Sequence, residues 1–370
     1  MRSYTPKALF SLAAVGVLAL SACGEAPDDE TDDDADAETA EENGDAQAED
    51  NSDYTACLVS DEGGWDDQSF NESAFTGLRN AIDDFGIDSS TAESSSEADF
   101  GPNVDAMVQQ GCDLTFGVGF LLEDAINDAA LDNPDLSFGI IDSTLPDEPE
   151  NGKPLVFNTS EASYLAGYLA ASMTETDTVA TFGGLQIPSV TVFMDGFADG
   201  VERYNDDNDA DVSLLGWDKD AQDGSFSGGF DDQSAGRALT EQFLAQDADI
   251  VMPVAGPVGL GAAGAIEDDG EAKLIWVDTD GYESTDYGDI ILTSVLKQIS
   301  QAVYDTVEEG VSGEFTSEPY VGDLENEGVG LAPFHDFEDE VPDEVQDKLE
   351  ELTEEIISGD TVVESENAPQ

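Results

Sequence analysis

The stretch that decides the fold is YTACLVSDEGGWDDQSFNESAFTGLRNAIDDF, residues 54–85. Its first part, Thr55–Val59, is short, apolar and rich in β-formers, which is typical of a strand inside a parallel sheet. Its last part predicts an amphipathic helix, because apolar residues recur at three- and four-residue steps: Phe70, Ala74, Leu78, Ile82 and Phe85. The stretch is therefore a strand, a turn and a helix in succession.

The turn between them, Asp61–Asp67, carries two glycines and several acids. A purely structural turn of this kind is usually shorter and less polar. Ligands of open α/β sheets bind just beyond the carboxyl ends of strands, where this turn lies. We therefore predict that it forms part of a binding site.

Strand-like and helical runs alternate from Tyr54 onward, which indicates an α/β fold with parallel sheets. The chain is too long for one compact core and predicts two domains. Predicted strands, apart from a poorly patterned one within Ser89–Ala98, are Thr55–Val59, Leu114–Val118, Leu136–Ile141, Val156–Asn158, Thr178–Phe182, Ser213–Leu215, Ile250–Val254, Leu274–Val277 and Ile290–Leu292. Predicted helices after the first are Asn103–Gln109, Glu161–Met173, Val190–Tyr204, Ser234–Ala245, Gly259–Glu267, Val295–Glu309 and Pro342–Ile357, with a short closing strand at Thr361–Glu364.

The run GGWDDQSFNESAFTGL resembles the signature of the basic membrane protein family of ABC-transporter substrate-binding lipoproteins, of the type that binds purine nucleosides. Four later segments resemble the same family in the same order: Ser163–Met173, Gly183–Gly200, Ala248–Gly261 and Trp276–Lys297. The resemblance implies a type I periplasmic-binding-protein fold, in which two doubly wound α/β lobes are joined by three crossovers and enclose a cleft.

The resemblance also implies domain boundaries. The first lobe would comprise residues 54–158 and about 282–312, and the second residues 159–281 and about 313–335. The chain would thus return to the first lobe near Tyr282 and cross again near Gly313. Residues 336–370 would form a helix and tail packed on the lobes.

The first 22 residues have the pattern of a secretory signal, with Arg2 and Lys7 preceding the apolar run Ala8–Leu20. This run is shorter than the about 20 residues that span a bilayer. The following Leu-Ser-Ala-Cys resembles the bacterial lipobox and implies lipidation of Cys23; an ordinary signal peptide is the alternative. Residues 23–53 are acidic, lack basic residues and predict a disordered tether. We expect a lipid-anchored protein on the outer face of the cell membrane.

The formal charge is −76, from 86 acidic and 10 basic residues. No basic face is available to neutralise phosphates, which excludes nucleic-acid binding. Dispersed acidity of this degree indicates adaptation to high salt. The acidic segment Asp207–Asp211 is superficially similar to a calcium loop, but Val212 stands where an EF-hand requires glycine. We expect no metal site.

Two cysteines remain after Cys23. Cys57 lies in the first predicted strand and Cys112 just before the third. In the strand order 2-1-3 these strands are neighbours, so a disulfide is geometrically compatible with the fold. Two buried free thiols are the alternative.

The resemblance places a nucleoside in the cleft, with its base between Phe70 and Phe226. Asp278, at the end of a predicted strand, would hold the ribose hydroxyls, and Lys297, on a predicted helix, would donate to the ligand or fix that carboxylate. Phe70 is alternatively a core aromatic, Lys297 a surface lysine and Asn71 a helix-entry residue. The other expected ligand-binding residues are Asp61, Asp67, Ser69, Asn71, Asp142 and Gly256.

The implied function is delivery of a purine nucleoside to the permease and ATPase of an ABC importer, through hinge closure around the ligand. Alternatives are a sugar or other small neutral solute, a ligand-sensing lipoprotein, and a nucleoside hydrolase. The chain has a single histidine, His335, and no defensible nucleophile–base pair, which disfavours an enzyme. No cofactor is expected, although Gly259–Gly264 matches the dinucleotide fingerprint G-x-G-x-x-G.

Overall fold

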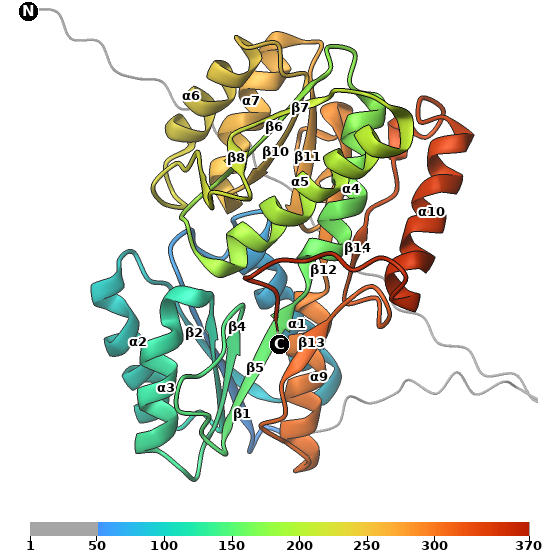
Figure 1. Ribbon diagram of the computed structural model, residues 1–370. Coiled ribbons are helices and arrows are strands. Elements are labelled where there is room, and N and C mark those ends of the chain that lie inside the picture. The colour runs from blue at the N-terminus through green and yellow to red at the C-terminus, as the bar shows by residue number, and fades with distance from the viewer. Residues whose placement is uncertain (1–50, 370) are drawn as a thin grey trace, which may run out of the picture. The chain divides into compact units, whose positions relative to one another are not determined.

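The computed structural model describes residues 51–369 (Figure 1). The predicted signal sequence, Cys23 and nearly all of the predicted tether lie outside the described residues. The tether was predicted to run to Asp53, but Asn51 already belongs to the folded part. Its side-chain amide donates to Phe85 O at 2.8 Å, and its carbonyl accepts from Tyr54 N.

The first of two large sheets has the order β13-β5-β4-β3-β1-β2, and all its strand pairs are parallel. The strand order 2-1-3 expected from the sequence is present. Its strands are β1 (Thr55–Ser60), β2 (Asp88–Ala92), β3 (Leu114–Val118), β4 (Ser137–Ile141), β5 (Gly152–Phe157) and β13 (Tyr320–Gly322).

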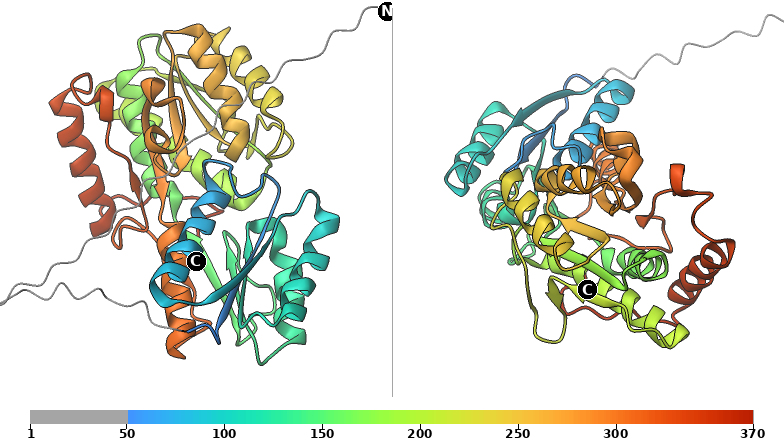
Figure 2. Two further views of the ribbon diagram at one scale, coloured as in Figure 1. Left: turned by 180° about the vertical axis from the view of Figure 1, so that it is seen from behind. Right: turned by 90° about the horizontal axis from the view of Figure 1, so that it is seen from above.

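Helices cover both faces of this sheet. On one face α1 (Phe70–Phe85) and α9 (Ile299–Ser312) lie side by side, as the view from behind in Figure 2 shows. Gly77 permits this close packing, because a Cβ there would collide with the carbonyl oxygen of Ser300. On the other face α2 (Glu97–Gln110) packs with α3 (Glu123–Asp132).

The second large sheet has the order β14-β12-β11-β10-β6-β7, in which only β14 is antiparallel to its neighbour. Figure 1 shows α4 and α5 on one side and α6 and α7 on the other. The strands are β6 (Thr178–Gly183), β7 (Ser213–Leu215), β10 (Ile250–Val254), β11 (Lys273–Asp278), β12 (Ile291–Lys297) and β14 (Val329–Leu331). The helices are α4 (Thr159–Met173), α5 (Pro188–Asn208), α6 (Gln233–Leu244), α7 (Gly259–Asp269) and the short α8 (Gly281–Ser284).

Each sheet with its helices forms one lobe, and this is the type I periplasmic-binding-protein fold. Sheet membership puts the crossovers after β5, after β12 and between β13 and β14. The positions predicted from the sequence for the second and third crossovers, near Tyr282 and near Gly313, are wrong. The reason is local: β12 is a buried strand that runs on to Lys297, and β13 has only three residues.

The end of the chain is fastened to the second lobe. Helix α10 (Asp343–Ser358) packs on α4. The segment Thr361–Glu364 is not a strand, contrary to our prediction, because no neighbouring strand pairs with it. The tail is instead fixed by side chains: Ser365 Oγ donates to Asp195 Oδ2 at 2.6 Å, and Lys219 Nζ donates to the carbonyl of Glu364.

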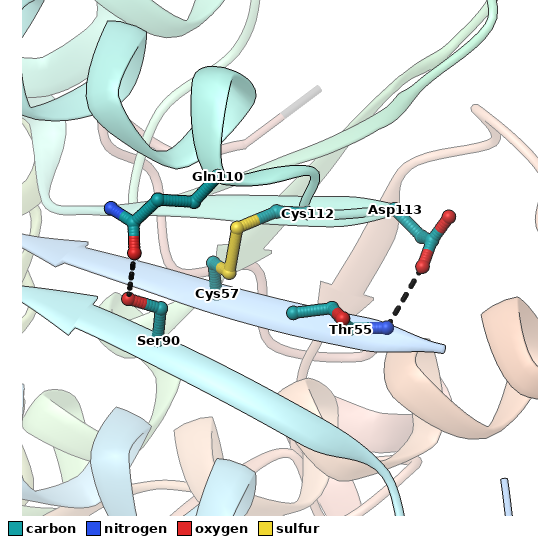
Figure 3. The surroundings of a disulfide bond; sticks show 6 residues. All are labelled: Thr55, Cys57, Ser90, Gln110, Cys112 and Asp113. Carbon is teal, nitrogen blue, oxygen red and sulfur yellow. Dashed lines mark hydrogen bonds between the residues drawn. A yellow bond between two sulfur atoms is a disulfide. The ribbon is translucent and has the colours of Figure 1, made fainter. Parts of the chain in front are cut away.

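A disulfide joins β1 to the loop before β3 (Figure 3). The Cα atoms of Cys57 and Cys112 are 6.1 Å apart, and both residues are buried. The structure thus realises the bonded alternative rather than two free thiols. Close by, Thr55 N donates to Asp113 Oδ2 at 2.8 Å, which fixes the same pair of strand ends.

Among residues 51–369 no helix is both long and apolar enough to span a bilayer.

Candidate functional site

A cavity lies where the carboxyl ends of strands from both sheets face each other. It encloses about 520 Å³ of empty space, counting its mouth, and residues of both lobes line it. Eight of the ten predicted ligand-binding residues line it: Asp61, Asp67, Phe70, Asn71, Asp142, Gly256, Asp278 and Lys297.

Lys297 is the cation of this cavity. It is the last residue of β12 and not, as predicted, part of a helix, and its side chain is 2% exposed. Its Nζ pairs with Asp142 Oδ2 and lies 3.5 Å from Asp278 Oδ1. It also lies 4.9 Å from the ring centroid of Phe70, within the range of a cation–π contact.

The two carboxylates that face Lys297 come from different lobes. Asp142 follows β4 of the first sheet, and Asp278 ends β11 of the second. Both residues adopt positive φ, 62° and 71°. Burial raises the pKa of Asp142, and the charge and hydrogen bond of Lys297 oppose this rise. A buried cation between two carboxylates leaves lone pairs that can accept ligand hydroxyls.

Asp67 supports the start of α1 rather than offering free oxygens. Its carboxylate accepts from the backbone N–H groups of Ser69, Asn71 and Glu72 at 3.0, 2.8 and 3.0 Å. These N–H groups have no partner inside the helix, so the carboxylate acts as a cap. Burial raises its pKa to about 6, against these hydrogen bonds.

Ser69 does not line the cavity but acts on a residue that does. Its hydroxyl donates to Asp278 Oδ2 at 2.8 Å. It thus holds the orientation of a carboxylate from the opposite lobe.

Asp61 and Asn71 form a polar pair on the wall of the first lobe. Asn71 Nδ2 donates to Asp61 Oδ1 at 3.0 Å, while the buried Asn71 Oδ1 has no hydrogen-bond partner among the described residues. Burial raises the pKa of the Asp61 carboxyl well above its ordinary value, and the nearby acids Asp67 and Glu62 raise it further. A carboxyl with a raised pKa binds its proton more tightly, and in the protonated form Asp61 would donate to a ligand as well as accept.

Two phenylalanines supply apolar faces from opposite lobes, Phe70 and Phe230. We predicted Phe226 for the second face, but Phe226 does not line the cavity. Its ring packs edge-on against Trp217 with centroids 6.1 Å apart, and its backbone bridges to Gly183. Phe226 and Phe230 belong to the same irregular loop, and the sequence of this loop has no periodicity that would show which of the two faces the cavity.

Several lining residues were missed by the sequence analysis. Phe120 follows Gly119 directly after β3, so the same position rule that selected Asp61 would have found it. Phe193 and Val190 lie within α5, where their apolar character is indistinguishable from that of core residues. The further missed residues are Gly119, Ile187, Ser189, Val254, Ala255, Pro257 and Val277, whereas Glu62 lies in the turn 61–67 that the sequence predicts as part of a binding site.

The arrangement suits the reversible binding of a flat, partly polar molecule. His335 is not in the cavity; it hydrogen-bonds Asp280 at 2.7 Å and stacks on Tyr282. Residues 51–369 contain no group of His, Cys, Asp and Glu side chains placed to hold a metal ion.

Comparison with known proteins places these features in a family. A family model described as "ABC transporter substrate-binding protein PnrA-like" matches residues 55–367. The ABC transporter nucleoside-binding protein BmpA of Lactococcus lactis is 31% identical over 75% of this chain and 81% of its own length. Basic membrane protein A of Borreliella burgdorferi is 29% identical over 65% of this chain and 68% of its own.

The fold has matching solved structures. A solute-binding protein of an ABC transporter system from Aeropyrum pernix superposes with a TM-score of 0.77, at 24% identity, over 85% of this chain and 94% of its own. At this identity the likeness bears on the fold.

Proposed function

Because the chain belongs to the PnrA-like family of ABC-transporter substrate-binding proteins, we propose that its ligand is a purine nucleoside. Membership makes it a substrate-binding component of an ABC transporter, which works with a permease and an ATPase, and not an enzyme. The proposal concerns the ligand, the way in which it is held and the attachment of the protein to the membrane.

The observation that carries the proposal is the position of Lys297 between Asp142 and Asp278, beneath the ring of Phe70. A nucleoside needs flat apolar surfaces for its base and acceptors for its ribose hydroxyls. Phe70 and Phe230 offer the first, and stacking on aromatic rings contributes about 1–3 kcal/mol per base. Asp278 and Asp142 offer the second, with Lys297 balancing their charge.

The edge of the base would meet Asp61 and Asn71. Both residues are buried, and Asn71 Oδ1 is still without a hydrogen bond among the described residues. Buried polar atoms are almost always paired, so this oxygen favours a ligand that brings a donor. A purine edge carries donors and acceptors side by side, which matches a wall that offers both.

Binding would proceed by closure of the two lobes. The ligand contacts come from both lobes, so the full set exists only when the lobes are together. A ligand that binds the closed state better shifts the population toward it.

Lipidation of Cys23 and export by the preceding signal sequence are part of the proposal. One relative, from Pyrococcus abyssi, is named an uncharacterized lipoprotein and is 29% identical over 74% of this chain. We propose that Cys23 carries the anchor, that residues 24–50 link it to the folded part, and that the protein works in concentrated salt.

Calorimetry tests the ligand class. The mature protein in molar salt is titrated with adenosine, guanosine, inosine and ribose. Micromolar or tighter binding of the nucleosides is expected, with loss of binding in Asp278→Ala and no change in Asp289→Ala, an exposed residue of the same lobe. Heat with ribose alone would replace the nucleoside by a sugar, and no heat with any of the four would contradict the proposal.

A further inference from the structure

One backbone oxygen of the first lobe receives three donors from the second. The carbonyl of Gln68, in the loop between β1 and α1, accepts from Trp276 Nε1 at 3.3 Å. It also accepts from Thr279 Oγ1 at 3.1 Å and from Ser284 Oγ at 3.2 Å. These donors lie on β11, on the loop after it and on α8.

The next residue adds two more contacts between the lobes. Ser69 Oγ donates to Asp278 Oδ2 at 2.8 Å and lies 3.2 Å from the carbonyl of Val277. Ser69 is fully buried. We call Gln68 and Ser69, together with Trp276, Thr279 and Ser284, the clasp.

The first-lobe half of the clasp is held in place by its own lobe. Gln68 has a positive φ of 57°, and its N–H donates to Glu72 Oε2 at 3.1 Å. Asp67 binds the N–H groups on the following turn, including that of Ser69. The Gln68 carbonyl is therefore aimed at the second lobe by bonds that do not involve the second lobe.

We propose that the clasp is a ligand-independent closing contact, and that it positions Asp278 for the ligand. This inference rests on the hinge closure proposed above. The two halves of the clasp belong to different lobes and lie outside the crossovers after β5 and β12 and between β13 and β14, so the proposed closure would bring them together. Every hydrogen bond of the clasp is made by protein groups alone.

Two consequences follow. The clasp raises the fraction of free protein that is closed, and closure in turn completes the orientation of Asp278 before the ligand arrives. Because apparent affinity scales with the competent fraction, weakening the clasp weakens binding without touching the ligand.

The test uses the double variant Thr279→Val/Ser284→Ala. The two hydroxyls lie 3.1 Å apart, so removing both leaves neither partner stranded. Thr285→Val is the matched control, because Thr285 Oγ1 donates within its own segment, to Gly281 O at 2.7 Å. Spin labels are attached at the exposed positions Leu131→Cys and Gln242→Cys, one on each lobe. Double electron–electron resonance spectroscopy then reports the distance between the lobes.

In the ligand-free protein the double variant is expected to lower the ratio of closed to open molecules by roughly tenfold, since two hydrogen bonds are lost. Thr285→Val should match the unmutated protein. Equal distance distributions in the double variant and the unmutated protein would overturn the proposal. If the double variant does not fold, Ser284→Ala alone carries the same test, with an expected change of about threefold.

The distance measurement needs no ligand, so it stands even if no nucleoside binds. If nucleosides bind but the clasp variants leave the distances unchanged, the proposed function stands and the proposed role of the clasp is wrong.

Discussion

Lys297 at the end of the second lobe's β12 forms an ion pair with Asp142, which follows β4 of the first lobe. The two side chains are 2% and 9% exposed, so this pair between the lobes is almost completely shielded from water. In a chain with 10 basic and 86 acidic residues, a buried lysine at the meeting point of two sheets is a costly feature. The cost is understandable if the pair is part of the binding site.

Replacing this lysine should remove binding and reduce stability. Lys297→Met leaves Asp142 and Asp278 buried without their cation, and breaking a buried ion pair costs about 3–5 kcal/mol. We expect that loss in the free energy of unfolding by denaturant and no measurable nucleoside affinity. As a control, Lys273→Met, at the start of β11, should change the free energy of unfolding by less than about 1 kcal/mol. A stable, binding-competent Lys297→Met would disprove the central role of the lysine.

The disulfide should contribute strongly to the first lobe. Cys57 and Cys112 are 55 residues apart. Closing a loop of that length lowers the conformational entropy of the unfolded chain and so stabilises the folded state by about 4 kcal/mol. Reduction, or the double variant Cys57→Ser/Cys112→Ser, should lower the melting temperature. The single variant Cys57→Ser should leave the thiol of Cys112 unpaired. Unchanged melting under reductant would show that the bond is not formed in solution.

Stability should rise as the pH falls from 8 toward 5. Burial raises the pKa of Asp67 to about 6 in the folded protein, above that of an unfolded aspartate, about 3.9. The folded state therefore binds the proton more tightly, so this contribution is complete below pH about 4 and is lost as the pH rises through about 6.

Chemical denaturation at several pH values in constant salt measures this slope. Asp67→Asn should flatten it between pH 5 and 7, whereas Asp83→Asn, exposed on α1, should not. An identical slope in all three proteins would refute the assignment to Asp67.

Salt should favour closure at the mouth of the cavity. Glu62 of the first lobe and Asp231 of the second lobe both lie close to Gly229. If Gly229 carried a methyl group, its carbon would lie 4.0 Å from Glu62 Oε2 and 3.5 Å from Asp231 Oδ1, so the two carboxylates approach each other across the cleft between the lobes. Burial and then the charge of Asp231 raise the pKa of Glu62. Added salt screens such repulsion.

The dissociation constant should therefore fall with rising salt, and less steeply in Glu62→Gln than in the unmutated protein. Asp105→Asn, exposed on α2, serves as the control. Titrations at several salt concentrations decide the matter, and parallel slopes for Glu62→Gln and the unmutated protein would rule out a role for Glu62.

The core strands could be predicted from the sequence because they are continuous apolar runs. Leu114–Val118 and Ile250–Val254 are buried throughout and have the predicted bounds, as does the edge strand Ser213–Leu215. The boundary between the strand and the helix near Lys297 could not be predicted from the sequence. Val295, Ile299, Ala302 and Val303 continue one helical spacing across the end of β12, so periodicity alone places the helix too early.

Within the site, residues at the ends of strands could be predicted by position, as Asp61 and Asp278 were. Residues on irregular loops could not be placed with equal accuracy. Phe226 and Phe230 are four residues apart; the Phe226 ring packs against Gly183 and the Phe230 ring against Gly184. These contacts join distant segments and leave no trace in the local sequence pattern.

A crystal structure of the protein grown with inosine in concentrated salt shows directly whether a nucleoside occupies the cavity. We expect the purine between the rings of Phe70 and Phe230, with ribose hydroxyls on Asp278 and Asp142 and the base edge on Asp61 and Asn71. Inosine bound elsewhere, or a cavity that holds no nucleoside at saturating concentration, would contradict the proposed function.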